Sequence, residues 1–189
     1  MQINLVHLYP NLLNIYGDRG NIQTLIYRCQ KRNIKVNLKT IKPQDPLPLG
    51  SFDLLFAGGG QDQQQLIVEK DLQKRKTVLT KAALNHIPML TICGSYQLFG
   101  QYFKTFDNQK IKGIGIFDAY TVASKKRKIG NVTIKTSLPL KIKTMVGFEN
   151  HSGNTFLQSP TKPLGKVVKG FGNNGEDKTE GATKNNVFG

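Results

Sequence analysis

Strand-type runs and helix-type segments alternate over the first hundred residues, and this alternation constrains the fold more than any other feature. Short apolar runs occupy residues 3–9, 34–41, 52–57 and 87–92, and helical spacing of apolar residues marks 21–33, 62–86 and 94–103. The order β-α-β-β-α-β-α predicts an α/β fold with an open, mostly parallel sheet and helices on both faces. Reactive groups in such sheets lie at the carboxyl ends of strands. We expect the second helix to break near Thr77.

The second half of the chain is β-rich. Residues 113–122, 129–137 and 142–150 are strand-like and separated by turn residues, and no long helical period follows residue 105. The polar tail ends in "NNVFG", which is typical of the beginning of a strand. These patterns predict a single domain over 1–189 that is incomplete at its C-terminal end.

The composition limits the function classes. A formal net charge of +15 indicates an anionic partner or surface. The basic residues are not interleaved with aromatic ones, so a solvated basic surface is favoured over nucleic-acid binding. Two cysteines without zinc-ligand spacing predict neither a disulfide framework nor a metal site. We find no secretory leader and no apolar run long enough to span a membrane, and therefore expect a cytoplasmic protein without membrane insertion.

Cys93 follows an apolar run and precedes a helix-type segment, in "LTICGSYQLFG". A cysteine on such a turn presents its sulfur at the sheet edge, where the dipole of the next helix favours the thiolate. The backbone N–H groups of Gly94 and of the Gly-rich turn 58–60 are then candidate oxyanion donors. Cysteine is also a common core residue, and the pattern alone leaves both interpretations open. Cys29 lies on the apolar face of a helix and is expected to be core.

A thiol nucleophile usually needs a base, and the chain contains three histidines. His7 lies inside a strand and His86 in an exposed turn. His151, in "GFENHSG", is the only candidate on pattern alone. Arg127 and its neighbours Lys125, Lys126 and Lys128, in "SKKRKIG", belong on pattern alone to a surface basic run.

Several motifs resemble one enzyme family. "LTICGSYQLFG" is similar to the nucleophile motif of class I glutamine amidotransferases of the cobyric-acid-synthase-like branch. "GFENHSG" resembles the second signature of that branch, and "FAGGGQDQQQ" resembles its oxyanion loop. Within the branch, "LYPNLLNIYGDRGNI", "RCQKRNI" and "GNNGEDKTEG" look most like the glutaminase subunits of lipid II isoglutaminyl synthases.

The resemblance implies a reaction and a set of roles. Cys93 would attack the carboxamide of L-glutamine and release ammonia, with the N–H groups of Gly94 and Gly59 stabilising the oxyanion. Arg127 and His151 would bind the substrate, and no metal would be needed. A Mur-ligase-like partner subunit would use ATP and Mg²⁺ to amidate the D-glutamate of lipid II in peptidoglycan biosynthesis. This subunit would carry no cofactor and would meet the inner face of the membrane through the complex.

The chain departs from the family pattern in three places. Thr91 and Ser95 stand where the broad class has glycine, and Ser95 adds a hydroxymethyl group at a tight contact. The family's catalytic histidine lies in a Tyr-x-His-Gly-Pro segment expected directly after "NNVFG", so the resemblance does not make His151 the base. Three alternatives stay open: a non-catalytic subunit that only binds its partner, a glutaminase serving a corrinoid-amidating synthetase, and a nucleic-acid-binding protein.

Overall fold

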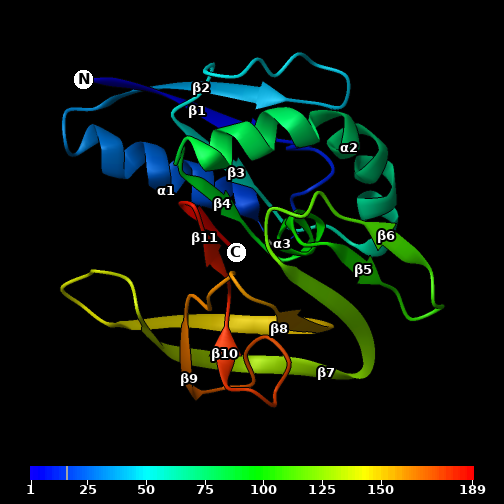
Figure 1. Cartoon of the computed structure of the whole chain (residues 1–189). Helices are drawn as coiled ribbons and strands as arrows, with labels where there is room; N and C mark the ends of the chain where they lie inside the picture. The colour runs from blue at the N-terminus through cyan, green and yellow to red at the C-terminus, as the bar shows by residue number, and fades with distance from the viewer. Residues whose placement is uncertain (16) are drawn as a thin grey trace. The chain divides into compact units, whose positions relative to one another are not determined.

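The computed structural model describes residues 1–15 and 17–189, which form two compact units (Figure 1). The first unit comprises residues 1–96 with 185–187. The second comprises residues 97–184 with 188–189.

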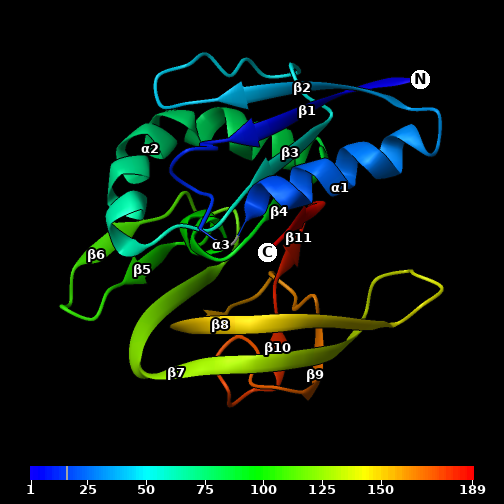
Figure 2. The same cartoon turned by 180° about the vertical axis from the view of Figure 1, so that it is seen from behind.

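The first unit is a parallel sheet with helices on both faces. Its elements are β1 (Gln2–Leu8), α1 (Asp18–Gln30), β2 (Lys35–Ile41), β3 (Leu54–Ala57), α2 (Asp62–Leu84), β4 (Met89–Thr91) and the start of α3 (Gly94–Phe99). The strands follow the order β4-β3-β1-β2, and every pair among them is parallel. Figures 1 and 2 show α2 on one face of this sheet and α1 on the other. The predicted α/β class and element order are confirmed.

Alternating side chains of the central strands fill both faces of the sheet. Leu5 and Phe56 pack against Ile22 of α1, and all three are buried. Burial of such side chains stabilises the unit by about 2 kcal/mol each. This core fixes the carboxyl ends of β3 and β4, from which the candidate site is built.

Helix α2 is one continuous element of 23 residues, so the break expected near Thr77 is wrong. Val68, Leu72 and Leu79 are all buried and stay in phase on one helical face across Thr77. The burial of this continuous apolar face outweighs the weak helix propensity of the β-branched Thr77.

Helix α3 is shorter than predicted, because Tyr102–Lys104 forms β5 instead of a last helical turn. This strand pairs in parallel with residues 120–122 and antiparallel with residues 110–112. Pairing with these two later segments, rather than local periodicity, decides the conformation of residues 102–104.

Apart from the end of α3, the regular elements of the second unit are strands. They are β5, β6 (Lys110–Lys112), β7 (Ala119–Thr136), β8 (Thr144–Leu157), β9 (Gly165–Lys169), β10 (Thr179–Glu180) and β11 (Thr183–Lys184). The order is β10-β9-β7-β5-β6, with β8 also paired to β7. The β-rich second half is confirmed, although one 18-residue strand with an irregularity between Ala123 and Lys128 replaces two expected segments.

The "NNVFG" segment forms β12 (Val187–Phe188), as its strand-like pattern predicts. The sheet of the first unit continues from β4 to β12, where the Met89 N–H donates to the Asn186 carbonyl over 3.1 Å. Val187 is fully buried there. No helix among the described residues is long and apolar enough to cross a membrane.

Candidate functional site

Cys93 stands on a sharp turn between β4 and α3. The strand ends at Thr91, the helix begins at Gly94, and Cys93 itself has φ +54°. A non-glycine residue in this left-handed region is strained, and such strain persists only where the surroundings impose it. The predicted strand–turn–helix arrangement is therefore present.

Ser95 ties this turn to the neighbouring strand. Its hydroxyl donates to the Ala57 carbonyl over 2.6 Å and accepts from the Ile92 N–H over 2.9 Å. The hydroxymethyl group is thus accommodated at the tight contact by hydrogen bonds that glycine could not make. Ser95 joins the ends of β3 and β4 and holds the Cys93 backbone in place.

The Gly-rich loop 58–60 lies against the turn. A Cβ added to Gly94 would lie 2.6 Å from the Gly60 carbonyl oxygen, and one added to Gly59 would lie 3.2 Å from Cys93 Cβ. Contacts this close exclude a side chain at Gly94 and leave Gly59 very little room. The structure therefore brings together three of the predicted site residues: Cys93, Gly94 and Gly59.

Two buried side chains that sequence reasoning missed shape the same loop. Asp18, in the first turn of α1, accepts the Gly59 N–H over 3.0 Å, and Gln65 of α2 donates to the Gly60 carbonyl over 3.1 Å. Both lie within quoted motifs, "YGDRGN" and "GGGQDQQQ", which is the only signal that could have found them. Since the Gly59 N–H is bonded to Asp18, its role as an oxyanion donor stays a prediction.

The surroundings of Cys93 favour the neutral thiol. Burial raises the pKa of Cys93, the Gly94 N–H partly offsets this by bonding the sulfur, and the charges of Asp18 and Asp62 raise the pKa further. The net direction is opposite to the thiolate-favouring effect expected from the start of the helix. Proton removal is thus a step that the site must assist.

The structure places Arg127 and His151 in the second unit, on opposite faces of the β7–β8 ribbon. Arg127 is exposed, and its Nε donates to Asn150 Oδ1 over 2.9 Å. His151 pairs in register with Lys128 on the other face. The two residues therefore do not converge within the unit that contains them, and their substrate-binding roles stay predictions.

His151 belongs to a buried polar cluster. Its Nδ1 lies 2.8 Å from the Gly153 carbonyl, and its Nε2 lies 3.9 Å from a Glu149 carboxylate oxygen. Glu149 accepts backbone N–H groups of Phe171 and Gly172 over 2.8 and 2.9 Å. Burial lowers the pKa of His151, so its imidazole is neutral at pH 7.

Lys128 is buried, which corrects the expectation that it belongs to a solvated basic run. Its ammonium group donates to Asn154 Oδ1. Burial and the charge of Lys126 lower its pKa. Strand alternation turns Lys128 inward while Arg127 stays exposed.

Groups of three or more His, Cys, Asp or Glu side chains arranged to hold a metal ion do not occur among residues 1–15 and 17–189.

Comparisons with known proteins agree with this geometry. Residues 4–189 match the model of the CobB/CobQ-like glutamine amidotransferase domain. Two relatives bear the name lipid II isoglutaminyl synthase (glutamine-hydrolyzing) subunit GatD. The one from Staphylococcus aureus is 40% identical over 188 residues, which cover 100% of this chain and 75% of the relative. The one from Streptococcus pneumoniae is 41% identical over 189 residues, which cover 100% of this chain and 72% of the relative.

Among solved structures, PurLQS from Thermotoga maritima matches with a TM-score of 0.67 at 14% identity. The match covers 100% of this chain and 86% of that one. Identity this low shows a shared fold alone.

Proposed function

The chain belongs to the CobB/CobQ-like glutamine amidotransferase family, and from that membership we propose that it is the glutamine-hydrolysing subunit of a lipid II isoglutaminyl synthase. The observation that carries the proposal is the strained Cys93 on the β4–α3 turn, in contact with the Gly-rich loop. A cysteine on a strained turn, next to glycine backbone that a substrate can approach closely, is placed to attack a carbonyl carbon.

The reaction proceeds in two steps. Cys93 loses its proton and its sulfur attacks the side-chain carboxamide carbon of L-glutamine, which gives a tetrahedral oxyanion stabilised by the Gly94 N–H. Ammonia leaves with the transferred proton, and a thioester remains on Cys93. Water then adds to the thioester, glutamate departs, and the thiol is restored.

The remaining roles rest on matched motifs and on chemistry. Arg127 is an exposed guanidinium that can hold the substrate carboxylate in two parallel hydrogen bonds. The neutral, anchored His151 is suited to a hydrogen bond with the substrate rather than to charge pairing. None of the three histidines in the sequence lies in a Tyr-x-His-Gly-Pro segment, so the proposal names no base within residues 1–189.

The ammonia would pass to a Mur-ligase-like (MurT-like) partner subunit. That partner would bind ATP and Mg²⁺ and amidate the D-glutamate of lipid II, at the inner face of the membrane. Identity of 40% and 41% along the full chain to two GatD subunits supports this branch over a corrinoid-amidating synthetase.

The test is glutamine hydrolysis by this chain with its Mur-ligase-like partner, followed as glutamate release. Cys93→Ala is expected to lower the rate at least about a thousandfold, because the nucleophile is lost. Cys29→Ala is the matched control and should retain the activity. Measurable glutamine hydrolysis that is equal in the Cys93 variant and the unchanged protein would refute the proposal.

A glutamine-mimicking electrophile separates the catalytic proposal from a subunit that only binds. Selective labelling of Cys93 that excess glutamine blocks supports a formed glutamine site. Equal labelling of Cys29 and Cys93, with the partner still bound, would favour a non-catalytic subunit.

A further inference from the structure

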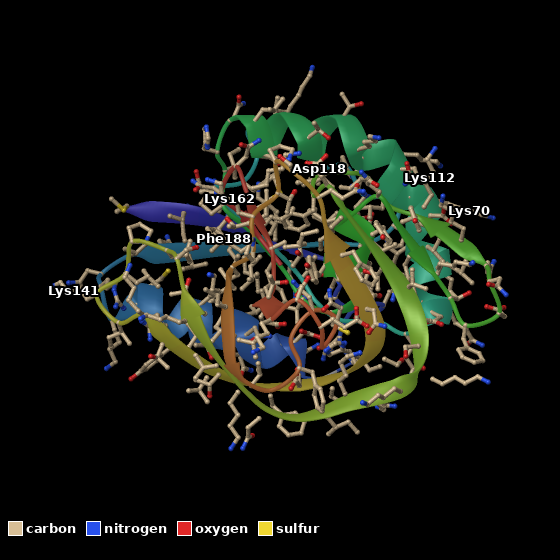
Figure 3. All side chains as sticks on the ribbon, turned by 60° about the horizontal axis from the view of Figure 1, so that its bottom comes forward. Lys70, Lys112, Asp118, Lys141, Lys162 and Phe188 are labelled. Carbon is tan, nitrogen blue, oxygen red and sulfur yellow. The ribbon has the colours of Figure 1, made fainter. Side chains whose placement is uncertain are left out.

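The tip of the β7–β8 hairpin presents aliphatic and lysine side chains in alternation. Leu140 and Ile142 are 48% and 76% exposed, and Lys141 and Lys143 beside them are exposed as well. The Lys143 ammonium donates to the Leu138 carbonyl, which holds the loop in shape. Figure 3 shows Lys141 at the outer edge of the hairpin.

The same mixture continues on the exposed face of the sheet. The β7–β8 register places alternate residues on one face, whereas the opposite face holds buried Val132 and Ile134. Several large apolar side chains here are each more than half exposed. They lie on the exposed face or, for Val168, at the bulge of β9, and they are Ile129, Val146, Phe148 and Val168. The exposed lysines that accompany them are Lys135, Lys166 and Lys169. Together with residues 138–143 they form what we call the hairpin surface.

The hairpin surface has charge of one sign. Residues 119–148 contain seven Lys or Arg and no Asp or Glu, and residues 160–175 also lack both acids. Positive charge that no carboxylate within these ranges offsets attracts an anionic surface. The occupant must therefore combine negative charge with a layer that accepts aliphatic side chains.

We propose that the hairpin surface docks on the anionic face of a lipid bilayer. Leu140 and Ile142 enter the boundary between headgroups and acyl chains, while Lys141 extends to the phosphates and Lys143 holds the loop in shape. Protein interfaces are depleted in lysine, and a nucleic acid offers no apolar layer for the tip. The chain then lies on the membrane rather than spanning it. This inference does not depend on the glutaminase chemistry.

The test is sedimentation of the full chain with vesicles. We expect binding to phosphatidylcholine vesicles that contain phosphatidylglycerol and no binding to phosphatidylcholine alone. Raised salt should weaken the binding, because it screens the lysine charges. Each lysine near the surface contributes a factor of about five in affinity.

Two pairs of variants locate the contact. Leu140→Ser with Ile142→Ser should weaken binding at low salt, whereas Ile67→Ser with Leu84→Ser on α2, at residues 58% and 61% exposed, should not. Lys141→Glu should lower the affinity more than about fivefold. Lys70→Glu on α2 carries the same charge change and should have a smaller effect (Figure 3).

Three results would overturn the proposal. The first is no sedimentation with the anionic vesicles. The second is an equal loss in the hairpin and α2 variants, which would indicate attraction by net charge alone. The third is loss of binding to the purified Mur-ligase-like subunit in the hairpin variants with vesicle binding unchanged, which would make the surface a protein interface. If the double variant fails to fold, Lys141→Glu decides the question.

Discussion

At the residue scale, Cys93 combines a backbone held at φ +54° with a thiol whose ionisation its surroundings oppose. The buried Asp18 acts on this thiol and on the loop beside it. Its carboxylate fixes the Gly59 N–H and its negative charge raises the pKa of Cys93. One side chain therefore shapes the loop and adds to the effect of burial, which raises the pKa of Cys93.

Asp18→Asn tests this double role. The amide oxygen can still accept from the Gly59 N–H, but the negative charge is gone, so the pKa of Cys93 should fall. Alkylation of Cys93 is expected to become several-fold faster at mildly alkaline pH, with its midpoint moved to lower pH. The measurement is the iodoacetamide rate against pH, with Cys29 as internal reference. An unchanged or slower rate at Cys93 would contradict the electrostatic argument.

Gly94→Ala tests the contact between the turn and the loop. The added methyl group would lie 2.6 Å from the Gly60 carbonyl oxygen, and we expect a loss of about 2 kcal/mol in the free energy of unfolding. Gly20→Ala in α1 is the control, since nothing lies within 4 Å of its new Cβ. That variant should gain up to about 1 kcal/mol. Equal denaturation midpoints in the two variants would refute the contact.

The candidate site was predictable where its signals are local. The small-residue turn after an apolar run identified Cys93 and Gly94, because β4, the turn and α3 are consecutive in sequence. Asp18 was not predictable, because its partner Gly59 lies 41 positions away and only the fold brings them together. The raised pKa of Cys93 is likewise a product of burial, which sequence patterns do not report.

At the element scale, α2 is anchored by a buried network. Asp71 accepts from Tyr9 Oη over 2.6 Å and from the Gln44 N–H over 2.9 Å, and it pairs with Arg75 on the same helix. Burial by itself raises the pKa of Asp71. The hydrogen bonds from Arg75, Tyr9 and Gln44, with the Arg75 charge, outweigh burial and hold the pKa below its ordinary value.

Asp71→Asn is therefore expected to lower the free energy of unfolding by about 3 kcal/mol at neutral pH, because it leaves Arg75 buried without its charge partner. The pKa of Asp71 is depressed in the folded state. The contribution of Asp71 to the free energy of unfolding is thus present at pH above its ordinary pKa of 3.8. It is lost as the pH falls through the lower pKa of the folded state. In urea titrations, the free energy of unfolding of the variant should therefore depend less on pH in the acid range. Tyr9→Phe should lower the free energy of unfolding by about 1 kcal/mol and keep the dependence on acid pH.

The elements themselves were predicted unevenly. Those of the parallel sheet were predicted because each carries its own periodicity, as α2 does across Thr77. Strand β5 and the continuity of β7 across the two expected segments were missed, since pairing with other strands decides them. Lys128 is buried because the alternation of side chains along β7 directs it inward, although its neighbours in sequence are charged.

At the scale of the whole molecule, β4 depends on a strand from far along the chain. Val187→Ala, at a fully buried position, should cost about 2 kcal/mol and speed hydrogen exchange at the Met89 amide. Val168→Ala is the control at a side chain 70% exposed, and a change below about 0.5 kcal/mol is expected. Unaltered exchange at Met89 in the Val187 variant would show that β4 holds without this neighbour.

The pairing of β4 with residues 186–188 also sets an order of events during translation. The Asn186 side chain donates to the carbonyl of His86, a hundred positions earlier, so the strand that leads to Cys93 lacks this neighbour while those hundred residues leave the ribosome. Until then the nascent chain exposes a strand edge that other chains could pair with. The edge of β4 beside the reactive turn is thus covered only after the second unit has been synthesised.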